Sequence, residues 1–200
     1  QSGYQDVERL LNTCGMAKAL PSRREGFLPE QISLTLCKAH RALPVSQLET
    51  EEQVRQVMAG PVWHGMALDL MLGNLEQPLW GWSDPEALHL LEYWRDLDPT
   101  LCFILVYDNP HTAIARSESY DPFAESDENI DRHLNSWSAY NAAMLRFFHR
   151  NTGRCLLVHG RAVRASANHY LQEVRARIDA PWTPERDPNF VTDEPRSPTR

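Results

Sequence analysis

The sequence has few cysteines, no long hydrophobic run and no leader-like start. The cysteines lie far apart and form no C-x-x-C pair; they are Cys14, Cys37, Cys102 and Cys155. This spacing disfavours a disulfide framework or a zinc site and is typical of buried or free thiols, so we expect a reducing compartment and a cytoplasmic protein. No apolar run approaches the roughly 20 residues of a membrane helix. No basic segment followed by an apolar one opens the chain, so no signal peptide is visible.

Common catalytic motifs are also missing. The eight histidines form no H-x-H or H-E-x-x-H pair, which disfavours a metal site. The chain has no G-x-S-x-G segment typical of serine hydrolases and no G-x-G-x-x-G segment typical of dinucleotide-binding enzymes. Hydrolase, dinucleotide and metal chemistry are therefore without support in the sequence.

The composition is that of an ordinary globular protein. Of the 200 residues, 42% are apolar and 24% are charged, which suffices for one domain with a sizeable core and excludes a collagen-like, coiled-coil or wholly disordered chain. The net charge of −7 argues against general nucleic-acid binding. The chain begins at Gln1 rather than at a methionine, so we expect a fragment or a processed form.

Charge is distributed unevenly. The segment 132–172 contains no acidic residue but six arginines, namely Arg132, Arg146, Arg150, Arg154, Arg161 and Arg164, whereas 118–131 is strongly acidic. One interpretation is a basic face that meets phosphate or sulfate groups. The other is a set of solvated helix faces that pair with the acidic segment.

Helical spacing and capping residues predict most of the secondary structure. Apolar spacing and helix-start or helix-stop residues predict helices at 5–14, 29–40, 50–60, 61–74, 84–97, 110–117, 127–150 and 160–178. Gly15 is expected to follow the end of the first helix, Thr50 and Gln53 to form a capping box, and Asp84 to cap the fifth helix.

Short apolar runs at 79–82, 101–107 and 155–159 predict three strands. Because strands and helices alternate, we expect an α/β fold in three layers, a parallel sheet flanked by helices, with a further strand before Gln1. This domain would span 1–180, and the proline-rich, charged segment 181–200 is predicted to be a flexible tail.

Four segments in a fixed order carry a family resemblance. They are Ser2-Gly3 before the first helix, Trp80-Gly81-Trp82-Ser83-Asp84-Pro85, Asp108-Asn109-Pro110 followed by Arg116-Ser117, and Trp137-Ser138-Ala139-Tyr140-Asn141. Over about residues 1–165 this order resembles the sulfotransferase family, the P-loop-like enzymes that use 3′-phosphoadenosine 5′-phosphosulfate (PAPS).

The resemblance implies specific roles. The 5′-phosphosulfate of PAPS would lie at Ser2 and Gly3, on the N-terminus of the first helix, where backbone N–H groups and the helix dipole favour anions. The 3′-phosphate would be held by Arg116 and Ser117. His64 is the candidate base that deprotonates the acceptor hydroxyl; its alternative is an ordinary partly buried or surface histidine.

The sequence departs from the family pattern at its basic positions. Gln1, Ser83 and Glu86 stand where the family has basic residues, and Asp108 replaces the arginine that binds the 3′-phosphate. A carboxylate about 4 Å from a phosphate would repel it by about 4 kcal/mol at an effective dielectric constant of about 20.

Two functions therefore stay open. One is a sulfotransferase that moves a sulfuryl group from PAPS to a hydroxyl of a carbohydrate or small metabolite. The other is a catalytically inactive sulfotransferase-like domain that binds or scaffolds inside a larger polypeptide.

Three further side chains have a functional and an ordinary interpretation. His159 ends a predicted strand at the edge where α/β sheets bind ligands, but it is equally typical of a satisfied polar group there. Trp80 and Trp82 lie on one face of their strand and either stack on a ligand ring or belong to the core.

Overall fold

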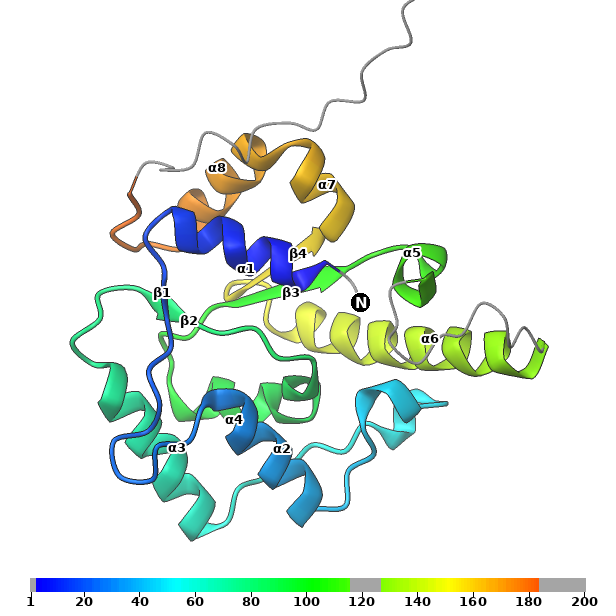
Figure 1. Ribbon diagram of the computed structural model, residues 1–200, viewed down its shortest axis with the longest axis horizontal. Helices are drawn as coiled ribbons and strands as arrows, with labels where there is room; N and C mark the ends of the chain where they lie inside the picture. Colours follow the sequence, from blue (N-terminus) through cyan, green and yellow to red (C-terminus); the bar gives the residue numbers. More distant parts are fainter. Residues whose placement is uncertain (1–2, 116–126, 184–200) are drawn as a thin grey trace, which may run out of the picture.

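The computed structural model describes residues 3–115 and 127–183, which form a mixed α/β fold that is mostly helical (Figure 1). The helices are α1 (Tyr4–Thr13), α2 (Pro29–Ala39), α3 (Pro61–Asn74), α4 (Leu91–Leu97), α5 (Pro110–Ala115), α6 (Asp127–Arg150), α7 (Gly160–Ala165) and α8 (Ala167–Arg177). The strands are β1 (Ala17–Lys18), β2 (Trp80–Gly81), β3 (Phe103–Tyr107) and β4 (Cys155–His159), and the 3-10 helices are η1 (Val45–Gln47), η2 (Glu51–Gln53) and η3 (Pro85–Leu90).

The three predicted strands are confirmed, and their pairing is parallel. β3 pairs with β4 from Phe103–Cys155 to Tyr107–His159, and β2 pairs with a short strand, β1. The strands form two separate pairs rather than one continuous sheet, which corrects the expected architecture. β1 was not predicted because two residues carry no period-2 pattern.

Helices cover both faces of the β3–β4 pair (Figure 1). Ile104 and Val106 pack against the core formed by α1, α7 and α8, whereas Phe103 and Leu105 pack against α6. Alternate side chains of β3 thus enter opposite cores, as the apolar run 101–107 predicts for a strand buried on both faces.

A second helical group encloses its own core. Ile32 and Leu36 of α2, Leu70 of α3 and Trp94 of α4 are at most 1% exposed and pack together. The buried His89 joins the segments around them, since its ring nitrogens lie 2.9 Å from the carbonyl of Leu43 and 3.3 Å from that of Arg55.

The predicted helix ends agree well with the structure. Gly15, with φ of 100°, follows α1, and its left-handed conformation is the one that glycine adopts at low cost. The Asp84 side chain caps η3 by accepting the Glu86 N–H at 3.0 Å. Thr50 and Gln53 form the predicted capping box.

Two predicted helices are wrong in extent, and the helix predicted at 84–97 is a 3-10 helix, η3, before α4 begins at Leu91. The helix at 50–60 is a single turn, η2, because Val57 instead buries its side chain and donates its N–H to the carbonyl of His89 at 2.9 Å. Gly60 then precedes a proline, a position that disfavours helical backbone. The helix at 160–178 is divided at Ser166, which leaves the helical conformation between α7 and α8.

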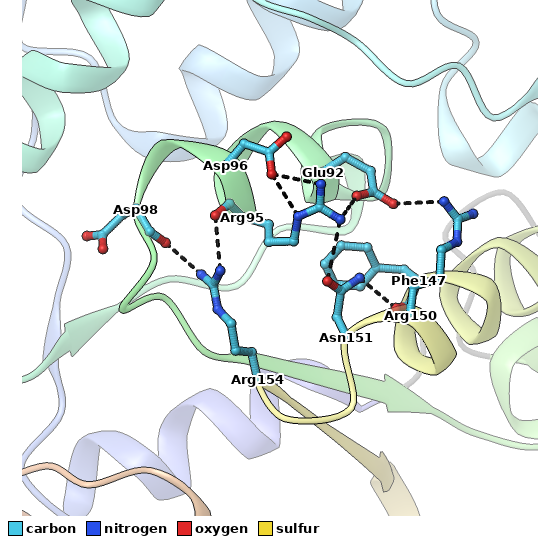
Figure 2. A network of polar contacts seen from close by, with 8 residues as sticks. All are labelled: Glu92, Arg95, Asp96, Asp98, Phe147, Arg150, Asn151 and Arg154. Atoms are coloured by element: carbon cyan, nitrogen blue, oxygen red, sulfur yellow. Dashed lines mark hydrogen bonds and ion pairs between the residues drawn. The ribbon is translucent and has the colours of Figure 1, made fainter.

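A polar network ties α4 to the β3–β4 pair (Figure 2). The Arg154 guanidinium, just before β4, donates to the carbonyls of Arg95 at 3.1 Å, Asp98 at 2.6 Å and Leu101 at 2.9 Å. Arg95 in turn forms ion pairs with Glu92 and Asp96. Arg154 therefore donates to two carbonyls at the end of α4, those of Arg95 and Asp98, which the helix leaves without intrahelical partners, and to the Leu101 carbonyl that follows.

Within the described part of the chain, no helix is long and apolar enough to cross a membrane. Most of the predicted tail, residues 184–200, lies outside the described residues. Trp182, inside the predicted tail, packs against the core of α1 and α8.

Candidate functional site

A cavity of about 920 Å³ lies between α1, the segment around β2 and η3, the strand β3 and the helix α6. Three stretches that carry the family resemblance contribute lining residues, namely 80–85, 108 and 137–141. The volume is within the roughly 300–1,000 Å³ of small-molecule sites. This cavity is therefore the candidate functional site.

The wall combines aliphatic and aromatic side chains with acidic ones. The acidic lining residues are Glu8, Asp84, Glu86, Asp98, Asp108 and Asp179. Among the described lining residues there is no lysine or arginine, and His133 is the one residue that can carry positive charge. The aromatic lining residues include Tyr4, Trp80, Trp82, Trp137 and Tyr140. The described wall therefore carries more acidic than basic side chains.

Asp84 is an acid held in an unfavourable environment. Burial raises its pKa from 3.8 to about 6, against the Ser33 hydroxyl and the Glu86 backbone N–H, which lower it, and the carboxylates of Glu86 and Glu30 add to the increase. Burial also raises the pKa of Glu86, although that carboxylate accepts the Val45 N–H at 3.2 Å. Little positive charge thus compensates these two carboxylates.

Asp108 directly follows β3, at the carboxyl edge of the strand pair, and is 1% exposed. Its Oδ1 accepts the Asn109 N–H at 2.8 Å and lies 3.6 Å from Nε2 of His159. Its Oδ2 is buried and has no hydrogen-bond partner among the described residues. Trp137 donates its indole N–H to the Asp108 carbonyl at 3.0 Å, which fixes the strand end against α6.

His159 has a structural role that its sequence position left open. Its Nδ1 accepts the Ala162 N–H at 3.3 Å, so the side chain caps α7. In this arrangement the proton of the neutral ring lies on Nε2, on the side of Asp108. The ring of Tyr107 meets the His159 ring edge-on at 5.1 Å between centroids.

Of the residues predicted to bind PAPS, the structure describes one. Gly3 is the N-cap of α1, with φ of 80° in the left-handed region. As at any helix N-terminus, the first backbone N–H groups of α1 have no intrahelical acceptor. Ser2, Arg116 and Ser117 lie outside the described residues.

The candidate base His64 is placed away from the cavity. It lies in the first turns of α3, its side chain is exposed, and it is not among the lining residues. Its Nδ1 lies 3.2 Å from the Tyr93 hydroxyl. The structure therefore does not bring His64 together with Gly3 or Asp108 in one site.

The arginines of 132–172 do not form one anion-binding face. Arg146 pairs with Glu51, Arg150 with Glu92, and Arg164 with Asp6, while Arg154 binds backbone carbonyls. These ion pairs join separate elements, and the acids involved belong to segments other than 118–131. Four of the six arginines, namely Arg146, Arg150, Arg154 and Arg164, thus join separate elements of the fold.

Sequence reasoning missed the acidic character of the cavity. Glu8 of α1 and Ser83 meet there, with the Ser83 hydroxyl donating to the carboxylate at 2.6 Å. The segment Asp84-Pro85-Glu86 is a signal of this acidity that the sequence carries. These carboxylates line one cavity only because segments distant in the sequence come together in the fold.

The described residues of this cavity fit PAPS poorly. PAPS carries several negative charges, and the wall offers carboxylates in place of lysine or arginine. The buried Oδ2 of Asp108 is an acceptor without a hydrogen-bond donor, and a phosphate oxygen cannot supply that donor.

Comparison of the chain with models of protein families, with curated proteins and with solved structures finds no match.

Proposed function

We propose that this chain is a ligand-binding module on a sulfotransferase-like domain and does not use PAPS. The observation that carries the proposal is Asp108, a buried carboxylate at the strand end where the family resemblance implies an arginine. Loss of the arginine weakens binding of the 3′-phosphate, and a carboxylate in its place also repels that phosphate.

The surroundings of Asp108 support the same conclusion. His159 Nε2 lies 3.6 Å from Asp108 Oδ1, and its Nδ1 already caps α7. Asp84 and Glu86, which also line the cavity, occupy the segment where the resemblance implies further basic residues. The volume of about 920 Å³ leaves room for a small-molecule ligand.

Thermal unfolding with 3′-phosphoadenosine 5′-phosphate (PAP), the desulfated cofactor, tests this proposal. A ligand of the native state at about 100 times its Kd adds roughly 2.7 kcal/mol, which raises the midpoint of a chain of this size by several degrees. We expect no rise with millimolar PAP or with ATP, while an active sulfotransferase measured in parallel responds to PAP. A rise with PAP and not with ATP would contradict the proposal.

The second candidate is an active sulfotransferase, and Gly3 favours it. The left-handed Gly3 at the start of α1 retains the backbone arrangement that accepts a phosphate at a helix N-terminus. Transfer of labelled sulfate from PAPS to a panel of hydroxyl compounds, sugars included, tests it. Labelled product that requires the intact chain would establish the transferase, and its absence together with the PAP result leaves the binding module.

A further inference from the structure

The charge of the cavity indicates what kind of ligand it accepts. We propose that it binds an organic cation, a primary amine carried on an aromatic or apolar body. This inference rests on the binding function proposed above and specifies the ligand of the same cavity. No step of it requires a bond to be made or broken.

The first observation is the imbalance of charge on the wall. Six carboxylates line the cavity, whereas the described lining residues include no lysine or arginine. Asp84 and Glu86 come from one short segment, and Asp108 comes from the end of β3. An ammonium group in this cavity would be attracted by these carboxylates, and an anion would be repelled.

The second observation is the unused acceptor on Asp108. This side chain is 1% exposed, yet its Oδ2 has no hydrogen-bond partner among the described residues. A buried carboxylate oxygen without a donor is costly and rare. The N–H groups of an ammonium ion supply such donors, and a hydrogen bond to a charged group is stronger than a neutral one.

The third observation is the aromatic lining. The rings of Trp80 and Trp82 stack with their centroids 5.8 Å apart, and Trp82 meets Trp94 edge-on at 5.3 Å. All three residues line the cavity. Ring faces attract cations and also accept flat apolar groups, so the wall suits both parts of an aromatic amine.

A bare metal ion suits the cavity less well. Among the residues that the structure describes, no group of three histidine, cysteine, aspartate or glutamate side chains could hold a metal. The volume of about 920 Å³ is also that of an organic molecule rather than of an ion. The proposal is therefore restricted to organic amines.

Three indole compounds of similar size test the sign of the charge. Tryptamine is a cation at pH 7, tryptophol is neutral and indole-3-acetate is an anion, and each is titrated into the full chain by calorimetry. We expect tryptamine to bind at least about tenfold more tightly than tryptophol, the effect of a charge-assisted hydrogen bond, and indole-3-acetate to bind more weakly than either.

Isosteric variants locate the binding. Asp108→Asn and Asp84→Asn each remove a charge and keep an oxygen that accepts the neighbouring backbone N–H. Each is expected to lower tryptamine affinity about tenfold and to leave tryptophol affinity unchanged. Asp69→Asn is the matched control, because Asp69 is 7% exposed and pairs with Arg24 outside the cavity.

The outcomes separate this inference from the function on which it rests. Equal binding of tryptamine and tryptophol would overturn the cation preference and keep the binding module. Binding of none of the three compounds, or an equal loss of tryptamine affinity in Asp69→Asn, would overturn the amine site. Binding of PAP would instead overturn the proposed function.

Discussion

Replacement of Asp84 by asparagine should stabilise the protein at neutral pH. Burial raises the pKa of this carboxyl from 3.8 to about 6, so the folded state holds its proton more tightly than the unfolded state does. Between these two values stability falls as pH rises, because folding then requires a buried carboxylate. Above pH 6 the full cost applies, and it disappears below the unfolded value.

The size of the effect follows from the shift. A difference of about two pKa units, at about 1.4 kcal/mol per unit, gives up to about 3 kcal/mol. Asp84→Asn removes the charge and keeps an oxygen that accepts the Glu86 N–H, so the cap of η3 is preserved. We expect the variant to be more stable than the wild type by up to about 3 kcal/mol at pH 7 and similarly stable at pH 3.5.

Urea unfolding followed by tryptophan fluorescence at several pH values measures this difference. Asp69→Asn is the control, because the Asp69 carboxylate accepts the Arg24 N–H at 2.7 Å and pairs with its guanidinium. That variant should lose stability at pH 7. The reasoning would be refuted if Asp84→Asn were no more stable than the wild type at pH 7, or if its advantage did not change with pH.

Three further substitutions test the packing by the shift in the urea midpoint. Arg154→Ala removes three hydrogen bonds to carbonyls near α4 and should cost about 3 kcal/mol. If Arg154→Lys recovers the wild-type midpoint, the planar fork of the guanidinium is not what these contacts require. Asn74→Leu removes the hydrogen bonds of the Asn74 side chain to the N–H and the carbonyl of Leu20 and should cost about 2–3 kcal/mol. An unchanged urea midpoint would mean that these bonds do not stabilise the fold. Gly15→Ala would place a methyl group 2.9 Å from the Thr183 hydroxyl, whereas the methyl group of Gly26→Ala, also at positive φ, meets nothing within 4 Å. Gly15→Ala should therefore lower the urea midpoint more than Gly26→Ala does. Equal decreases would mean that backbone strain alone determines the cost.

Most helices could be predicted because their start and stop signals are local. Pro29 and Asp84 start elements by restricting the backbone or capping free N–H groups, and Gly15 ends one by adopting positive φ. The strands β3 and β4 were equally visible as apolar runs. These features depend on a few neighbouring residues and need no tertiary information.

The remaining features depend on contacts between distant segments. The helix expected at 50–60 gives way to an extended segment because Val57 bonds to His89, more than thirty positions later. The cavity needs α1, the η3 segment and α6 to meet, so its acidic wall could not be inferred from any one stretch. His64 is a candidate base because of the chemistry of its side chain, but the sequence does not indicate which residues surround it. The fold places it on the exposed side of α3.

A calorimetric titration of the intact chain with PAP and with tryptamine, at pH 7, tests the central claim most directly. The acidic cavity predicts saturable binding of tryptamine and no binding of PAP at concentrations up to the millimolar range. Saturable binding of PAP would contradict the account, because it would require the positive charge that the described wall lacks.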